Sequence, residues 1–392
     1  MISYTKYNLV NDLGFVKTGV DNYSSIKKYF STGSIKKNKF IPKGSYDFKS
    51  RPSRANREVY EGDVLQARMQ NTNKIILVDK DLHGSLFSTG FFQFRPPKEL
   101  VVPKYLYYFL SSDLFLKRKD ELCGGSTQKA INDKNLKKID IFLPPLQEQQ
   151  RIVAKLDSAF AELDKAVEAV ENKITEISSL YENAVTAEFI SIESPLEKKL
   201  SDVCEKITDG THQTPKYFDE GYIFLSSKNV TSRKIDWENV RYIDEAQHIQ
   251  MHKRIAPRIG DVLLAKNGTT GVAAIVDKDI VFDIYVSLAW LRSKGDILPE
   301  YLLEFMNSKM AREQFTSRTK GIGVPNLHLQ EIREVIIQFP QDKEKQKLLI
   351  KKLKNIDDTC NRYKQINKQK HQNLISLKSA ILAQELQPSD AA

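Results

Sequence analysis

Hydrophobic positions recur at alternating spacings of three and four residues through the segment 146–190. Such a seam places one apolar stripe along a helix that packs against another helix. Pro144 and Pro145 stand just before this helix and Pro195 just after it, where proline limits a helix. At 1.5 Å per residue the helix would span roughly 60 Å, which suits a spacer better than a core helix. The seam positions are Val153, Leu156, Phe160, Leu163, Val167, Val170, Ile174, Ile177, Tyr181 and Ala184.

A second segment, 342–386, repeats this pattern less regularly, with Asn367 and Lys370 on the seam between two apolar groups. Polar seam residues lower stability but fix the register and the partner of a helix. The net charge is −6 for residues 144–195 and +5 for residues 341–392, which favours pairing of the two helices in antiparallel orientation. The alternative is that each helix packs only on its own domain. The apolar positions are Leu349, Leu353, Ile356, Cys360, Tyr363, Leu374, Leu377 and Ile381.

The rest of the chain contains an internal repeat. Its period of about 196 residues is much longer than a solenoid repeat and indicates a duplicated domain followed by a helix. We therefore expect the function to be carried out twice, at two places. The segments 62–68, 103–106 and 125–144 return as 260–266, 299–302 and 321–340.

Short β-type runs, such as 74–78 and 272–276, alternate with turns and with short helical patterns such as 104–118 and 300–315. Strands and helices do not alternate regularly as in βαβ units, so the pattern predicts an α+β fold. We expect two globular mixed α/β domains separated by two long antiparallel coiled-coil helices, with an internal pseudo-twofold repeat. The expected boundaries are 1–143 for the first domain, 144–193 for the first helix, 194–340 for the second domain, 341–388 for the second helix and 389–392 for a tail.

The net charge of the 392-residue chain is +10, which favours a polyanionic partner. Residues 1–143 carry +11 and residues 196–340 carry zero, so the first half is strongly basic and the second is not. No apolar run approaches the roughly 18 residues of a membrane span, and no secretory signal is visible. The three cysteines are far apart, as expected for reduced thiols. We therefore expect a cytoplasmic protein without a membrane segment.

Motifs for catalysis are missing from the sequence. There is no phosphate-binding loop of the Walker type and no nucleophile elbow. The six histidines show no metal-ligand spacing, and the Asn-Pro-Pro-Tyr motif of amino-methyltransferases is absent. Residues 162–165, Glu-Leu-Asp-Lys, are similar to a nuclease motif. They lie on the heptad helix, where a solvent-exposed helix face is the simpler interpretation. We expect no catalytic residue, no metal and no cofactor bound by this chain.

Polar, glycine-marked loops with basic side chains remain. Arg and Lys suit phosphates and guanine edges, while Asn and Gln suit adenine edges. For one loop a solvated turn is the simpler interpretation, but several loops, such as 124–127 and 320–323, fall at matched repeat positions. The DNA-binding candidates in the first half are Lys36, Lys37, Lys39, Arg51, Arg54, Arg57, Arg68, Ser126, Thr127, Gln128 and Lys129. Those in the second half are Thr211, His212, Gln213, Lys228, Asn229, Lys266, Asn267, Thr269, Arg318 and Lys320.

The segment from Leu143 to Asp157, with its Pro-Pro-Leu-x-Glu-Gln start, resembles the central conserved region of type I restriction–modification specificity subunits. The segment from Pro340 to Leu353 is a weaker second copy. Residues 209–215, Asp-Gly-Thr-His-x-Thr-Pro, resemble an opening found in the target-recognition domains of that family. The resemblance covers essentially the whole length. The first 57 residues depart from it, because they lack this motif and do not align with the second half.

This resemblance implies a non-catalytic DNA reader. Two target-recognition domains would each read one half of a bipartite, asymmetric site in double-stranded DNA. The long helices would separate these domains and dock two methyltransferase (modification) subunits, which bind S-adenosylmethionine and methylate adenine N6. Two restriction subunits, where present, would add translocation and cleavage that depend on ATP and Mg²⁺. All cofactors would then belong to partner subunits.

Two other functions compete with this one. The chain could be a coiled-coil interaction scaffold without DNA specificity, against which the basic first domain and its polar loops argue. It could also be a self-sufficient nuclease or methyltransferase, against which the missing motifs argue. In a DNA reader, the choice of bases depends on docking geometry and DNA shape as well as on residue type.

Overall fold

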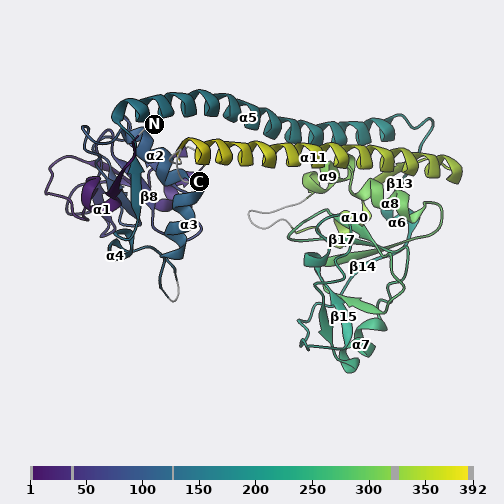
Figure 1. Cartoon of the computed structure of the whole chain (residues 1–392). Helices are drawn as coiled ribbons and strands as arrows, with labels where there is room; N and C mark the ends of the chain where they lie inside the picture. Colours follow the sequence, from purple (N-terminus) through teal and green to yellow (C-terminus); the bar gives the residue numbers. More distant parts are fainter. Residues whose placement is uncertain (1–2, 37–38, 126–127, 319–325, 387–392) are drawn as a thin grey trace. The chain divides into compact units, whose positions relative to one another are not determined.

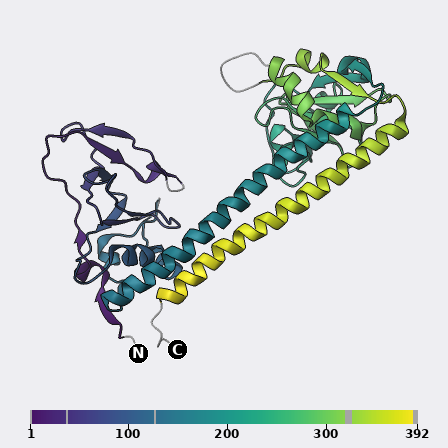
Figure 2. The same cartoon turned by 90° about the horizontal axis from the view of Figure 1, so that it is seen from above.

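The computed structural model describes residues 3–36, 39–125, 128–318 and 326–386, with the side chains of Lys36 and Arg318 outside this description. The chain forms two compact units, residues 1–171 with 369–392 (unit 1) and residues 172–368 (unit 2). The long helices α5 (Leu146–Ile190) and α11 (Lys343–Leu386) pass through both units. Figures 1 and 2 show them side by side. Both begin and end close to the positions predicted for the two heptad segments.

Unit 1 is built on two four-stranded sheets. In the first, the neighbouring strands are antiparallel, in the order β2 (Phe15–Val16), β11 (Phe91–Phe94), β8 (Val64–Ala67) and β9 (Ile75–Leu77). The second has the order β6 (Gly44–Tyr46), β3 (Lys27–Phe30), β10 (Leu86–Ser88) and β7 (Ala55–Glu58), with β3 and β10 parallel. Two strand pairs complete the unit: β1 (Thr5–Asn8) with β12 (Asp140–Leu143), and β4 (Ile35–Lys36) with β5 (Lys39–Phe40). Its short helices are α1 (Leu9–Asp12), η1 (Thr32–Ser34), α2 (Pro103–Ser111), α3 (Asp113–Glu121) and α4 (Asp133–Leu136).

Unit 2 repeats this plan. Its antiparallel sheet has the order β14 (Cys204–Asp209), β20 (Leu288–Ser293), β17 (Val262–Ala265) and β18 (Ala273–Ile275). A three-stranded sheet has the order β16 (Arg241–Ile243), β15 (Tyr222–Leu225) and β19 (Phe282–Ile284), with β15 and β19 parallel. The strand pair is β13 (Leu196–Lys199) with β21 (Ile336–Phe339). Its short helices are α6 (Leu200–Val203), η2 (Ser227–Asn229), α7 (Glu245–His252), α8 (Pro299–Met306), α9 (Lys309–Arg318) and α10 (Leu329–Arg333).

The repeat extends further toward the N-terminus than the sequence indicates. In unit 1, β1 pairs with β12, the last strand before α5, and is followed by α1 and by β2 of the antiparallel sheet. In unit 2, β13 pairs with β21, the last strand before α11, and is followed by α6 and by β14 of the antiparallel sheet. The parallel strand and the short 3-10 helix come next in both units. The first 57 residues therefore share the order of these elements with the second half although their sequences do not align, while β7 and the pair of β4 with β5 have no counterpart among the described residues of unit 2.

The repeated Gly-Asp-Val segment forms the same turn twice. Gly62 and Gly260 have φ of 90° and 88°, a left-handed conformation that glycine adopts without steric cost. The aspartate that follows is buried, and its carboxylate accepts a hydrogen bond from an arginine Nε, Arg95 at 2.9 Å in unit 1 and Arg292 at 2.8 Å in unit 2. The segment recurs because a turn and a buried carboxylate that pairs with an arginine both depend on it.

The two long helices pair in antiparallel orientation within each unit. In unit 1 the ion pairs Lys155–Glu385 (2.7 Å) and Asp164–Lys378 (2.7 Å) join them, and His371 Nε2 lies 3.5 Å from Glu171 Oε1. In unit 2 Lys352 lies 3.1 Å from Glu188. The basic side chains come mainly from α11 and the acidic ones from α5, as their net charges predicted. The ends of both helices also belong to the cores, with Leu156 and Leu382 in unit 1 and Phe189 and Leu353 in unit 2.

The predicted seam of α5 is buried or half-buried at every position. On α11 the prediction holds for Leu349, Leu353, Ile356, Cys360, Leu374 and Ile381, which are buried or half-buried. It is wrong for Tyr363, Lys370 and Leu377, which are exposed. Asn367 is half-buried as predicted, and the seam also runs through the half-buried residues Lys364, His371 and Lys378. An apolar pattern could not find it, because Lys378 and His371 lie on the seam to reach acidic partners on α5.

Helices that could cross a membrane are not found within the described ranges, since none combines sufficient length with sufficient apolar character. Cys123, Cys204 and Cys360 are free thiols, as predicted.

Candidate nucleic-acid interface

Three loops of unit 1 meet at one edge: η1, the loop after β8, and the turn between β10 and β11. Arg68 donates its backbone N–H to the carbonyl of Gly90 (2.9 Å), and the Lys74 ammonium donates to the carbonyl of Thr32 (2.8 Å). Thr89 donates its backbone N–H to the carbonyl of Arg54 (3.0 Å), so the segment before β7 joins the same edge. We call this the three-loop edge of unit 1.

The same three loops meet in unit 2: η2, the loop after β17, and the turn between β19 and β20. Lys266 occupies the place of Arg68 and donates its backbone N–H to the carbonyl of Ser287 (2.9 Å). Ser227 donates its N–H to Ser287 Oγ (2.9 Å) and its hydroxyl to Asn267 Oδ1 (3.2 Å). Thr269 Oγ1 donates to the carbonyl of Val230 (3.0 Å). This is the three-loop edge of unit 2.

The short 3-10 helix at each edge is positioned by a capping box. Ser31 and Ser34 exchange side-chain and backbone hydrogen bonds around η1, and Ser226 and Asn229 do so around η2. Such reciprocal bonds satisfy backbone groups at a helix start. Asn229 also donates from Nδ2 to the carbonyls of Asp236 and Asn239 and is 5% exposed. Asn229 was predicted to contact DNA, but its side chain is buried and its amide group is hydrogen-bonded within the protein.

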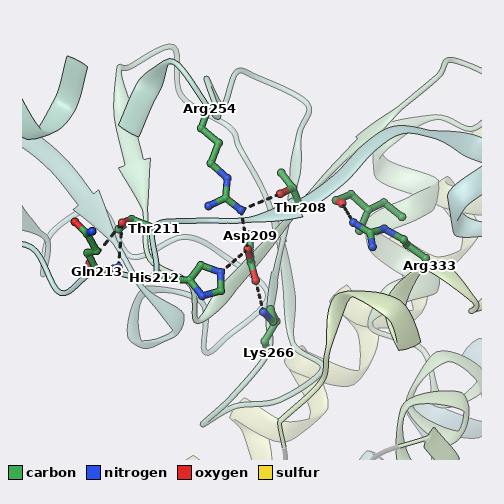
Figure 3. Close-up of polar contacts among 9 residues, drawn as sticks. Thr208, Asp209, Thr211, His212, Gln213, Arg254, Lys266 and Arg333 are labelled. Carbon is green, nitrogen blue, oxygen red and sulfur yellow. Dashed lines mark hydrogen bonds and ion pairs between the residues drawn. The ribbon is translucent and has the colours of Figure 1, made fainter. Parts of the chain in front are cut away.

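Asp209, at the end of β14, gathers three basic side chains (Figure 3). Its carboxylate is 2.5 Å from Lys266 Nζ, 3.2 Å from His212 Nε2 and 3.3 Å from Arg254 Nη2. Burial raises the pKa of Asp209, but the hydrogen bonds and charges of Lys266 and His212 outweigh it, so this pKa lies below its usual value. Asp209 therefore stays ionised at neutral pH and holds these side chains in place.

The three basic side chains of this cluster differ in accessibility. Lys266 is 6% exposed, so its charge is balanced inside the protein. The side chains of Arg254 and His212 are 50% and 65% exposed. Arg254 also donates to Thr208 Oγ1 at 3.5 Å, as Figure 3 shows. Of the three, Arg254 and His212 are the side chains able to reach a phosphate or a base edge.

A cavity of about 290 Å³ lies beside the Asp209 cluster. Its wall includes Thr211, His212 and Gln213 from the loop after β14, together with Gln250 and Arg254 from α7 and the segment that follows it. Gly210 lets this loop approach β19, because a Cβ at position 210 would come within 1.9 Å of the Ile284 carbonyl oxygen. Thr211 donates its N–H to the same oxygen at 3.1 Å. The Asp-Gly-Thr-His segment is thus a loop that is hydrogen-bonded to the end of β19 and that places its polar side chains at the cavity.

Several candidates of unit 1 have internal partners. Arg57 is 1% exposed and donates to the Val16 carbonyl (2.9 Å) and to Thr18 Oγ1 (2.7 Å). Burial, followed by the nearby charge of Arg68, lowers the pKa of Arg57 to about 10, which still leaves it charged at neutral pH. Arg68 pairs with Asp133 at 2.6 Å. The side chains of Arg57 and Arg68 therefore bind groups within the protein near the three-loop edge.

Other candidates of unit 1 present their side chains to solvent. Lys39, Arg54, Gln128 and Lys129 are exposed, while Arg51 is half-buried with its guanidinium 4.7 Å from the Phe48 ring. The Lys129 carbonyl accepts from Gln70 N at 2.9 Å, which brings this segment beside the loop after β8. In unit 2 Lys228 and Gln213 are exposed and Thr211 is half-buried. Lys37, Ser126, Thr127 and Lys320 lie outside the described residues, as do the side chains of Lys36 and Arg318.

Arg254 and Lys74 were missed by sequence reasoning. Arg254 follows α7, 45 residues after Asp209, and no motif marks it. Lys74 was assigned to a β-type run, but its ammonium turns back to η1. The repeat frame could have pointed to Lys74, since it lies in the loop after the repeated Gly-Asp-Val strand. Arg254 had no comparable signal.

Residues 10–176 and 195–372 each match the family described as "Type I restriction modification DNA specificity domain". The chain belongs to this family. It carries two copies of the domain, and each copy includes part of a long helix. The predicted resemblance and the predicted fold class are both confirmed.

Curated relatives agree with the family match. The chain is 23% identical over 312 residues to the type I restriction enzyme EcoKI specificity subunit of Escherichia coli K12, covering 73% of this chain and 66% of that protein. It is 22% identical over 329 residues to the MjaVIII specificity subunit of Methanocaldococcus jannaschii, covering 74% and 73%.

Solved structures share the fold. A chain from a study of complex assembly and conformational transition of the type I R-M system matches with a TM-score of 0.77 and 22% identity, covering 99% of both chains. The HsdS subunit from Thermoanaerobacter tengcongensis matches with a TM-score of 0.52 and 21% identity, covering 98% of this chain and 96% of that one.

Proposed function

We propose that this chain is the specificity subunit of a type I restriction–modification complex and that each unit reads one half of a bipartite, asymmetric site in double-stranded DNA. One observation carries the proposal: the three-loop edge recurs in both units around an equivalent backbone hydrogen bond, Arg68 N to Gly90 O and Lys266 N to Ser287 O, but with different side chains. Arg54 and Lys74 stand at the edge of unit 1, and Lys228 and Asn267 at that of unit 2. A common frame with divergent side chains suits two different half-sites.

The partners are two adenine-N6 methyltransferase subunits, which would dock on the long helices. Apolar side chains on α5 and α11 that neither helix covers support this part of the proposal. They are Leu180, Leu348, Tyr363, Ile366, Ile375 and Leu377, each at least 48% exposed. Large apolar side chains left exposed on the long helices are available to a partner protein. Leu377 then serves a partner and not the helix pair.

The chain itself is proposed to be non-catalytic and to work in the cytoplasm. S-adenosylmethionine would be bound by the modification subunits, and ATP and Mg²⁺ by two restriction subunits where the system includes them. The residues gathered at the three-loop edges are suited to position a duplex and to contact bases. Arg and Lys side chains bind phosphates, while Asn, Gln and Arg can make paired hydrogen bonds to purine edges.

A salt titration separates this function from a coiled-coil scaffold. Filter binding of random duplex at two salt concentrations should show affinity that falls as salt rises, because each phosphate contact releases counterions. Binding that ignores salt, or no binding, would favour the scaffold. The purified chain incubated with DNA and Mg²⁺, or with S-adenosylmethionine, should show no turnover; turnover would indicate an enzyme.

Methylome mapping tests the site itself. Cells carrying this chain and its modification subunit should methylate adenines in a bipartite sequence with a fixed gap. Inserting seven residues into both α5 and α11 adds about 10.5 Å of helix, or about three base pairs of DNA length. The insertion should leave both half-sites unchanged and lengthen the gap. An unchanged gap would contradict the role of the helices as a spacer.

A further inference from the structure

We propose that His248, His252 and Asp283 form a binding site for a divalent transition-metal ion of the zinc class. Among the described residues these three side chains bring one ligand atom each to within 4.8 Å of one another. Sequence analysis expected no metal, because the six histidines were judged to show no metal-ligand spacing. The third ligand comes from a strand 31 residues away, which only the fold brings to the helix.

Asp283 supplies the main evidence. It is 2% exposed, and one carboxylate oxygen, Oδ2, lies 2.7 Å from His248 Nδ1. The other oxygen, Oδ1, lies 3.4 Å from His252 Nδ1, and neither of these two buried atoms makes a hydrogen bond. Buried polar atoms without partners are rare in native proteins and call for an explanation such as an ion.

The spacing of the two unpartnered atoms suits a metal. Ligand atoms at about 2.0–2.1 Å from a tetrahedral zinc ion lie roughly 3.4 Å apart. An ion placed between His252 Nδ1 and Asp283 Oδ1 would therefore satisfy both atoms without moving them far. His248 would complete a set of two imidazoles and one carboxylate. This set suits Zn²⁺ and neighbouring first-row ions better than Mg²⁺ or Ca²⁺, which prefer oxygen ligands.

The surrounding elements hold the three side chains in place. His248 and His252 lie four residues apart on α7, so they share one face of the helix. The Asp244 side chain caps this helix by accepting from Gln247 N at 2.9 Å. Asp283 lies on β19, opposite Phe224 of β15. The Tyr222 ring stacks on His248 with centroids 3.8 Å apart and planes within 10°, which limits rotation of that imidazole.

An ion at this site would fasten α7 to β19. Asp283 also lines the cavity of about 290 Å³, to which α7 and the segment after it contribute Gln250, Met251 and Arg254. Metal binding would therefore stabilise one wall of the cavity beside the Asp209 cluster. This inference does not depend on the proposed function, because it rests on three side chains and their contacts within unit 2.

Zinc titration of the full chain tests the site. After treatment with a chelator that is then removed, the chain should bind about one Zn²⁺ with micromolar or tighter affinity in competition with a chromophoric chelator. His252→Gln should weaken this binding by about tenfold or more, since each ligand contributes directly to affinity. His328→Gln is the matched control, because His328 is an exposed histidine of the same unit outside the cluster, and it should bind Zn²⁺ like the unchanged chain.

Cobalt gives an independent readout. Co²⁺ bound by two imidazoles and a carboxylate should show visible absorption bands, and these should be absent for Asp283→Asn and His252→Gln but present for His328→Gln. Far-UV circular dichroism would establish that the variants are folded. If Asp283→Asn does not fold, the result for a folded His252→Gln tests the proposal. Absence of micromolar Zn²⁺ binding, or equal binding by His252→Gln, would overturn the proposal.

Discussion

Gln149 and Gln346 make the same three hydrogen bonds, one set in each unit. Both side chains are buried in the first turn of a long helix, at 1% and 0% exposure. Each accepts one backbone N–H and donates to two carbonyls, which ties the start of the helix to the loop before α2 or α8. The partners of Gln149 are Val102 N (2.9 Å), Leu100 O (3.1 Å) and Pro144 O (2.9 Å). Those of Gln346 are Leu298 N, Asp296 O and Pro340 O, all at 2.9 Å.

Removing either glutamine should destabilise the chain. Gln149→Ala leaves one buried N–H and two carbonyls without their partner, and so does Gln346→Ala; we expect about 2–4 kcal/mol for each. Urea unfolding followed by circular dichroism measures the loss. Gln150→Ala and Lys345→Ala, at the exposed neighbouring positions, are the controls and should change stability by less than about 0.5 kcal/mol. Equal effects at buried and exposed positions would contradict this role.

The Asp209–Lys266 pair should show strong coupling. Asp209→Asn leaves a buried ammonium without a carboxylate, and Lys266→Met leaves a buried carboxylate with the more exposed His212 and Arg254. Breaking a buried pair from one side typically costs about 3–5 kcal/mol. The double variant should recover part of this loss, since neither charge remains buried alone. A double-mutant cycle in urea measures the coupling, and simple additivity of the two changes would argue against it.

Acid should remove the contribution of Asp209. Because its pKa in the folded chain is lower than the ordinary value of 3.8, its ionisation stabilises the fold above that value. This stabilisation is lost as the pH falls through the lower pKa of the folded state. The difference in unfolding free energy between the unchanged chain and Asp209→Asn should therefore be constant near neutral pH and shrink below about pH 4. A difference that grows on acidification would contradict the direction of the shift.

Lys228 should act on DNA affinity and not on stability. Its side chain is exposed at the three-loop edge of unit 2, so Lys228→Ala should weaken binding of duplex DNA. If it contacts one phosphate, the slope of log affinity against log salt should fall by about 0.9. Lys351→Ala, at an exposed position of α11, is the charge-matched control. Identical slopes for the two variants would exclude a phosphate contact at Lys228.

Charge reversal should test the helix pair. Asp164→Lys and Lys378→Asp each replace an attraction between α5 and α11 by a repulsion, and each should destabilise the chain by about 0.5–1 kcal/mol. The double variant restores opposite charges and should recover most of the loss. Thermal unfolding at low salt, where screening is weak, is the sensitive measurement. Failure of the double variant to recover would mean that Lys378 acts through its packing on the Phe160 ring, 4.6 Å away.

Much of the architecture could be predicted because it depends on local pattern. The seam from Val153 to Ala184 predicted α5, since a helix that packs along one face needs apolar residues every three or four positions. The recurrence of Gly62-Asp63 as Gly260-Asp261 predicted a duplicated domain, because a left-handed turn and a buried carboxylate restrict the residues allowed there. The first 57 residues escaped this reasoning, since short strands such as β2 and β3 tolerate many sequences as long as they pair.

The candidate site was predicted less well, because residue type does not reveal where a side chain lies. Arg57 and Lys266 look like DNA contacts by composition, yet Arg57 is buried among carbonyl and hydroxyl oxygens and Lys266 against a carboxylate. Arg254, which carries no motif, reaches the cavity. Tyr363 and Leu377 fit a heptad by spacing but lie outside the helix pair, because charged side chains with acidic partners occupy the seam.

The sequence by itself determined the duplication, the two long helices, their opposite charges and the family. The duplication, the helices and their charges follow from repeats, periodicity and composition, while the family follows from the resemblance of segments such as 143–157 and 209–215. Tertiary structure alone decided which polar side chains are buried and which face solvent, and it brought His248 and His252 to Asp283 and Arg254 to Asp209. Those contacts join residues far apart along the chain, and their geometry depends on how strands and loops pack.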